Sequence, residues 1–101
     1  MPGFSTEVPH NLGRAQAVEK LKGFADRVRE KYKDQVSSMS GEWQDNLYNF
    51  AITTYGFTIS GVLTVEETLA RLEAKLPFAA LAFKGKIEQS FASEIKKALA
   101  S

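Results

Sequence analysis

The chain has 101 residues and a formal net charge of +1, with 44% hydrophobic and 25% charged residues. This length fits a single domain, residues 1–101, and the composition excludes a disordered chain and is typical of a globular one. No stretch approaches the roughly 18 consecutive apolar residues of a transmembrane helix, and the first residues do not form a secretory signal, so we expect a cytoplasmic protein.

The residue inventory also excludes several kinds of chemistry. The chain has no cysteine and one histidine, which argues against disulfides, thiolate catalysis and zinc sites. We therefore expect no metal and no cofactor, and an enzyme of a common type is not expected. The nearly balanced charge also argues against a nucleic-acid partner.

The first half of the chain predicts a strand, a helix and then a region of strands. Apolar residues alternate with polar ones over residues 4–8, and Pro9 ends this strand. A helix is expected over about residues 11–34, because apolar side chains recur every three or four positions. This stripe consists of Val18, Leu21, Ala25, Val28 and Tyr32.

The strongest period-2 pattern covers residues 48–65. A polar strand over residues 36–43 precedes it, with Met39 and Trp43 on its core face. Gln44-Asp45-Asn46 and Tyr55-Gly56 are typical of turns, and they divide the region into three strands.

The segment over residues 68–76 is ambiguous. Its alanine, leucine, glutamate and lysine residues favour a helix. The same residues alternate between apolar and charged, which instead predicts a strand that follows a turn at Glu66-Glu67.

The C-terminal part contains an apolar segment and a helix. Pro77 closes the ambiguous element, and residues 78–83 are expected to form about one helical turn. Lys84-Gly85-Lys86 interrupts the pattern, and a final helix then carries Ile87, Phe91, Ile95 and Ala98 on one face.

Several short motifs, read together, resemble the polyhydroxyalkanoic acid system proteins, a family of small bacterial domains. The resemblance covers residues 4–99, and its most specific parts are His10-x-Leu12-Gly13, Leu76-Pro77 and Phe83-Lys84-Gly85-Lys86-Ile87-Glu88. The family is named for a gene context near polyhydroxyalkanoate synthesis and granule proteins. The resemblance therefore implies a fold and a metabolic neighbourhood, but no reaction.

The resemblance resolves the ambiguous segment in favour of a strand. The expected fold class is α+β, with an antiparallel four- to five-stranded sheet and two helices on one face. The expected order is β-α-β-β-β-β-α, which is similar to a reduced helix-grip fold.

Residues 78–86 contain the first candidate binding site. Apolar side chains in a short connecting segment can form an exposed patch, and such patches usually mark binding surfaces. The candidates are Phe78, Leu81 and Phe83, with Lys84 and Lys86 beside them as cations for an anionic group. The alternatives are a lid over the core for the apolar residues and a solvated corner for the lysines.

A second candidate site is the junction at His10 and Arg14, where a strand meets a helix. These residues could bind an anion at the N-terminus of the helix. A histidine that only hydrogen-bonds its neighbours is the alternative, and it is the more common role for a lone histidine.

These observations lead to three functional hypotheses. The first is a non-catalytic binding module whose partner is a polyhydroxyalkanoate granule surface or a granule-associated protein. The second is a carrier of a small acyl- or lipid-like ligand, or a helix-grip-type enzyme, with a cavity under Trp43, Tyr48 and Phe50. The third is a self-assembling domain, since the sequence leaves the oligomeric state open.

Overall fold

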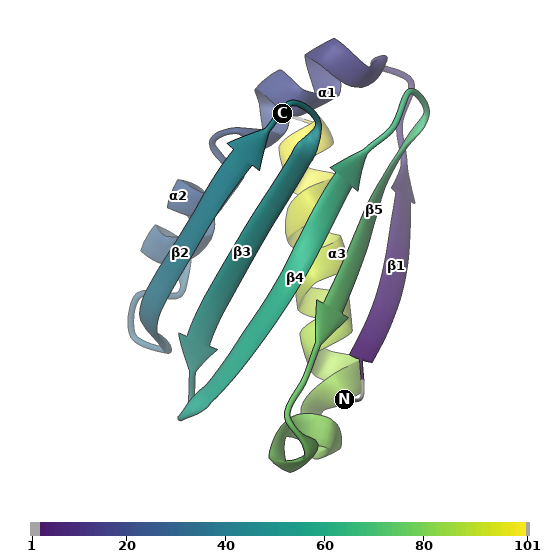
Figure 1. The fold of residues 1–101 in the computed structure, drawn as a ribbon. Helices are drawn as coiled ribbons and strands as arrows, with labels where there is room; N and C mark the ends of the chain where they lie inside the picture. The colour runs from purple at the N-terminus through teal and green to yellow at the C-terminus, as the bar shows by residue number, and fades with distance from the viewer. Residues whose placement is uncertain (1–2, 101) are drawn as a thin grey trace.

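The computed structural model describes residues 3–100, which form one five-stranded sheet with helices on one of its faces (Figure 1). The strands are β1 (Gly3–Pro9), β2 (Val36–Gln44), β3 (Leu47–Thr54), β4 (Phe57–Val65) and β5 (Leu69–Lys75), and all neighbours pair antiparallel in the order β1-β5-β4-β3-β2. The helices are α1 (Arg14–Leu21), α2 (Phe24–Lys31) and α3 (Lys84–Ala100), and the short 3-10 helix η1 (Phe78–Phe83) connects β5 to α3. The predicted α+β fold class is confirmed.

The ambiguous segment is a strand, as the resemblance implied. β5 lies between β1 and β4 and pairs with both. Its alternating residues Ala70, Leu72 and Ala74 are buried, while Glu73 and Lys75 are exposed. Pairing along both edges therefore outweighs the helical propensity of the residues.

The helix predicted over residues 11–34 is two helices. It begins at Arg14, is interrupted at Lys22-Gly23 and ends at Lys31. The fully buried positions are Ala17, Leu21, Phe24 and Val28, whereas Val18 and Ala25 of the predicted stripe are only partly buried. The buried positions keep helical spacing across the break, and they place Phe24, rather than Ala25, in the core.

The predicted interruption at Lys84-Gly85-Lys86 is wrong, because these residues are the first turn of α3. The chain passes from η1 into α3 without a loop, and the Lys84 N–H donates to the Leu81 carbonyl. Lys84 already has α-helical backbone angles. The exposed apolar segment is thus joined rigidly to the longest helix.

Large and small residues alternate across the middle of the sheet on the face that the helices cover. Phe50 of β3 is paired with Gly41 of β2 on one side and with Gly61 of β4 on the other. Gly61 is in turn paired with Ala74 of β5, which faces Phe4 of β1. The small residues leave room for the aromatic rings beside them.

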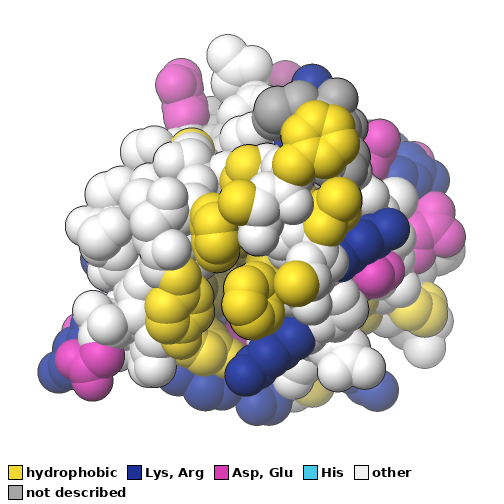
Figure 2. All heavy atoms as spheres, turned by 90° about the horizontal axis from the view of Figure 1, so that it is seen from below, with side chains coloured by type: hydrophobic (Ala, Val, Ile, Leu, Met, Phe, Trp, Pro, Cys, Tyr) yellow, Lys and Arg dark blue, Asp and Glu magenta, His cyan; other side chains and the backbone are white. Residues whose placement is uncertain are grey.

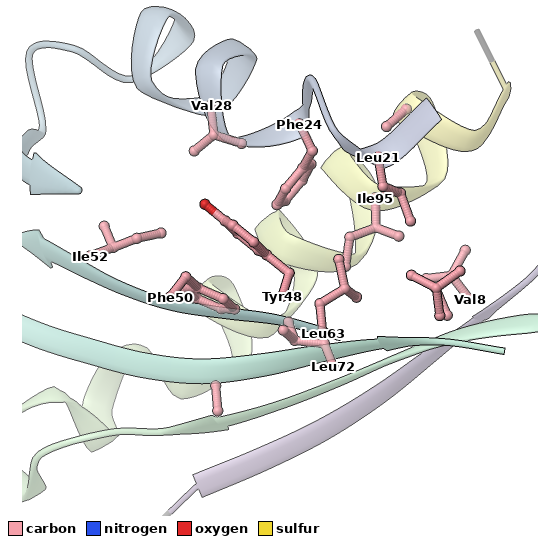
Figure 3. Packing of buried hydrophobic residues seen from close by; sticks show 14 of the residues in the cluster. Val8, Leu21, Phe24, Val28, Tyr48, Phe50, Ile52, Leu63, Leu72 and Ile95 are labelled. Carbon is pink, nitrogen blue, oxygen red and sulfur yellow. The ribbon is translucent and has the colours of Figure 1, made fainter. Parts of the chain in front are cut away.

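The helices close this face by inserting side chains between the aromatic rings. The Phe91 ring of α3 lies 6.1 Å from the Phe4 ring and 5.7 Å from the Phe50 ring, measured between centroids. Figure 3 shows Phe24 of α2 pointing toward Tyr48, and Ile95 of α3 pointing toward the sheet. Met39 and Trp43 pack against the edge of this core, which confirms the face predicted for them.

Candidate functional site

The exposed large hydrophobic side chains gather at one end of the molecule. Among residues 3–100 there are four of them: Tyr55 is 75% exposed, Phe78 76%, Leu81 40% and Phe83 53%. They come from the β3–β4 turn and from η1, which both lie at the lower end of the sheet in Figure 1. Figure 2 views this end directly and shows hydrophobic side chains clustered on it.

A ring contact joins the two chain segments. The Phe57 ring, at the start of β4, lies 6.4 Å from the Phe83 ring at the end of η1. We call Tyr55, Phe57, Phe78, Leu81 and Phe83 together the end patch. Its two segments, residues 55–57 and 78–83, are separated by 20 residues in sequence, so the fold, rather than a local motif, assembles it.

The geometry of η1 explains why its large side chains face outward. Pro77 is extended, and the Ala80 N–H donates to the Pro77 carbonyl to start the 3-10 turn. The residue that turns toward the core is Ala80, which is fully buried. The small Ala80 side chain occupies the side of η1 that faces the core, so the bulky side chains of η1 remain on the solvent side. The interpretation of residues 78–83 as a lid over the core does not fit Phe78, because three quarters of its surface is exposed to solvent.

Tyr55 is held outward by an unusual backbone conformation. Tyr55 has a φ of 52° and Gly56 a φ of 81°, as in the type I′ turn that joins two antiparallel strands. Positive φ is unfavourable for a bulky side chain, and the first position of this turn usually holds asparagine, aspartate or glycine. The tyrosine therefore occupies the tip of the hairpin at a cost in backbone energy.

Sequence reasoning found the η1 half of the end patch and missed the other half. Tyr55 was expected only as a turn residue, and Phe57 only as a strand residue. Alternation along strands does not show which turn lies beside residues 78–83. The available signal was an aromatic residue at a hairpin position that usually holds a small polar residue.

Two lysines border the end patch. Lys84 and Lys86 lie in the first turn of α3 and are exposed. Neither forms an ion pair within the described residues. Figure 2 shows basic side chains next to the hydrophobic cluster at this end. The predicted binding residues Phe78, Leu81, Phe83, Lys84 and Lys86 are thus all exposed, and they lie in η1 and the turn of α3 that follows it.

His10 and Arg14 lie at the opposite end of the sheet, at the start of α1, and the fold does not bring them near the end patch. The buried His10 ring accepts a hydrogen bond at Nδ1 from the Leu12 N–H (3.1 Å) and donates from Nε2 to the Glu66 carbonyl (3.1 Å). Both ring nitrogens are therefore engaged in holding α1 to the β4–β5 turn. This is the geometry of the hydrogen-bonding alternative, and anion binding by His10 and Arg14 remains an untested prediction.

Aromatic rings occupy the space beneath the sheet where a ligand cavity was considered. Trp43 stacks on Tyr48 with a centroid distance of 5.0 Å, and Tyr48 stacks on Phe50 at 5.7 Å. Burial raises the pKa of the Tyr48 hydroxyl, as expected for a ring in a dry interior.

Two hollows among the described residues lie elsewhere. One is a depression on the uncovered face of the sheet, and no helix residue lines it. The other is a surface groove between α2 and α3 that holds the Glu94 carboxylate. Neither lies between the sheet and α3.

A charged cluster connects α2 to α3 in that groove. The Glu94 carboxylate accepts hydrogen bonds from Lys31 Nζ (2.6 Å) and from the Tyr32 hydroxyl (3.0 Å). Burial alone would raise the pKa of Glu94, but the hydrogen bonds from Lys31 and Tyr32 outweigh it, so this pKa lies below its ordinary value. The cluster satisfies its own charges and serves to hold the two helices together.

Residues 3–100 hold no group of three or more histidine, aspartate or glutamate side chains that could bind a metal ion. No helix within this range is both long and apolar enough to cross a bilayer.

These features define a small sheet-and-helix domain with a packed interior and an apolar end. Residues 5–99 match the family model described as "Putative polyhydroxyalkanoic acid system protein". The chain therefore belongs to this family, and the resemblance inferred from its short motifs is confirmed.

Comparison with solved structures and curated proteins does not identify a function. One similar solved structure is titled "Crystal structure of Ara h 8.0201", with 10% sequence identity and a TM-score of 0.47 over 97% of this chain and 94% of that one. At that similarity it carries no argument about function. No curated protein matches the sequence.

Proposed function

We propose that the protein is a non-catalytic binding module that attaches to the surface of polyhydroxyalkanoate granules through the end patch. The observation that carries the proposal is the gathering of every exposed large hydrophobic side chain of residues 3–100 at one end. Such a patch loses contact with water when it meets an apolar surface, and this provides the driving force for binding. Family membership supplies the chemistry of that surface, an aliphatic polyester. Granules of this kind lie inside the cell, so the proposal also places the protein in the cytoplasm.

The packed interior favours this proposal over the carrier hypothesis. A pocket for a small ligand typically needs a few hundred cubic ångströms. The stacked rings of Trp43, Tyr48 and Phe50 fill the position where that pocket was considered. A flat or convex apolar surface requires no such pocket.

Co-sedimentation of the purified protein with amorphous polyhydroxyalkanoate particles tests the proposal. We expect the protein to pellet with the particles, and the double variant Phe78→Asp with Phe83→Asp to bind at least tenfold more weakly. Both side chains are more than half exposed, so the variant should keep the circular dichroism spectrum of the parent. Two new carboxylates at the contact would have to be desolvated, which opposes binding.

A matched control carries the same change in charge away from the end patch. Gln16 in α1 and Ser93 in the middle of α3 are both exposed, and their replacement by aspartate should leave binding unchanged. Binding by the Phe78→Asp, Phe83→Asp variant at the parent level would refute the role of the end patch. If the parent protein does not pellet with the particles, the proposal is wrong, and a soluble protein partner or a small ligand becomes the better hypothesis.

A further inference from the structure

A stretch of the chain that carries positive charge and no acidic residue contains the η1 half of the end patch. Between Ala74 and Ile87 the sequence contains Lys75, Lys84 and Lys86 and no acidic residue, although the whole chain has a net charge of only +1. All three lysines are exposed. They flank η1 on both sides in the sequence, and Lys84 and Lys86 lie in the first turn of α3, which follows η1 directly.

Within residues 3–100, these lysines differ from most other cations in having no carboxylate partner in an ion pair. Six lysine and arginine side chains of the described residues form ion pairs, among them Lys31 with Glu94 and Arg71 with Glu7. Lys75, Lys84 and Lys86 form no ion pair with any carboxylate in the described part of the chain. Their charge is therefore available to an external anion.

The position of Lys84 and Lys86 in α3 opposes the normal preference of a helix. The N-terminal turn carries a partial positive charge and favours acidic side chains. The first turn of α3 contains two lysines and no acidic residue. Residues that act against local stability are typical of functional surfaces.

We infer that the end patch binds an anionic phospholipid surface, with its aromatic side chains in the interface and Lys84 and Lys86 against the lipid phosphates. This inference rests on the proposed function, since it uses the same patch, and it names the chemistry of the layer that the patch meets. A neutral polyester offers the lysines no counter-charge, whereas lipid phosphates match them. Apolar insertion combined with lysine contacts is the general mode by which proteins attach to one face of an anionic membrane.

Flotation with vesicles of defined composition tests the inference. One vesicle contains phosphatidylcholine alone, and the other contains phosphatidylcholine with 30% phosphatidylglycerol. At low ionic strength we expect binding to the anionic vesicles, with weak binding to the neutral ones. Replacement of Lys84 and Lys86 by glutamine should weaken binding to the anionic vesicles about 25-fold, at about fivefold per lysine.

The matched control replaces two other exposed cations that form no ion pair within residues 3–100, Arg27 and Lys96, with glutamine. It changes the net charge equally, and its binding should stay within twofold of the parent. The Lys84→Gln, Lys86→Gln variant should be at least as stable as the parent, because it removes positive charge from a helix N-terminus. Loss of binding in that variant therefore cannot come from unfolding.

The outcomes separate this inference from the proposed function. Equal binding to both vesicles, or full binding by the Lys84→Gln, Lys86→Gln variant, would overturn the inference even if the protein pellets with bare polyester particles. Binding to anionic vesicles without binding to bare polyester would instead support the inference and contradict direct attachment to the polymer.

Discussion

Tyr55 contributes an aromatic side chain to the end patch, although its backbone conformation lowers the stability of the fold. Its φ of 52° places a bulky side chain in the left-handed region, which costs an ordinary residue about 1–2 kcal/mol. The ring receives little packing in return, because it is 75% exposed. A position under selection for stability alone would hold asparagine or glycine.

We therefore predict that Tyr55→Asn stabilises the protein by about 0.5–1 kcal/mol and weakens its binding to polyhydroxyalkanoate particles. Urea unfolding and co-sedimentation would measure the two effects separately. Tyr55→Phe is the control, since it keeps both the ring and the strained backbone and should change neither quantity. A Tyr55→Asn variant that is less stable than the parent would show that the tyrosine has a structural role.

At the scale of single elements, packing on the helix-covered face of the sheet depends on small residues. A Cβ atom added to Gly61 would lie 2.8 Å from the backbone oxygen of Glu73 and 2.9 Å from Cζ of Phe50. The β5 backbone at Glu73 on one side and the packed Phe50 ring on the other leave no room for an added methyl group at Gly61. By contrast, a Cβ added to Gly85 in the first turn of α3 would have no neighbour within 4 Å.

The same substitution should therefore have opposite effects at the two sites. We expect Gly61→Ala to destabilise the protein by about 1–3 kcal/mol through overpacking. Gly85→Ala should stabilise it by about 0.5–1 kcal/mol, because alanine is a better helix former. Chemical denaturation of both variants would measure this, and a neutral Gly61→Ala would mean that Phe50 moves aside without cost.

The elements also show what the sequence could and could not predict. Alternation over residues 48–65 was sufficient to predict two strands and the turn at Tyr55-Gly56, because side chains on a strand alternate regardless of tertiary context. For β5 the local propensity pointed to a helix, and only the resemblance gave the strand. The break at Gly23 escaped detection because apolar residues recur at helical spacing on both sides of it.

The candidate site was half predictable for a related reason. Phe78, Leu81 and Phe83 are neighbours in sequence, so their apolar character stood out. Their exposure depends on Ala80 taking the inner position of η1, which spacing alone does not reveal. The contribution of Tyr55 and Phe57 depends on sheet order, a property of the whole fold.

At the scale of the whole molecule, one charged cluster links elements far apart in sequence. Glu94 of α3 joins Lys31 of α2 and Tyr32 just beyond it, 62 or more residues earlier in the chain. The pKa of Glu94 lies below its ordinary value of 4.5 in the folded protein. The unfolded chain therefore binds a proton more readily than the folded protein, and acid favours unfolding.

We predict that this contribution to stability is fully present at neutral pH and declines as the pH falls below 4.5 and through the lower pKa of the folded state. Glu94→Gln should reduce the free energy of unfolding by about 1 kcal/mol at neutral pH. The difference between parent and variant should shrink in acid, where Glu94 is protonated in both states. Urea unfolding across this pH range would measure it, and a difference independent of pH would contradict the assignment.

The position of the end patch has a consequence for crowding on a surface. The molecule measures 37 × 25 × 22 Å along its principal axes, and the end patch lies at one end of its length (Figure 1). A molecule that touches a granule with this end stands upright and covers an area close to 25 × 22 Å, rather than the 37 × 25 Å of one lying on its sheet. A given granule could then carry a denser layer of the protein, with the α1 end directed away from the polymer and the uncovered sheet face turned sideways toward neighbouring molecules.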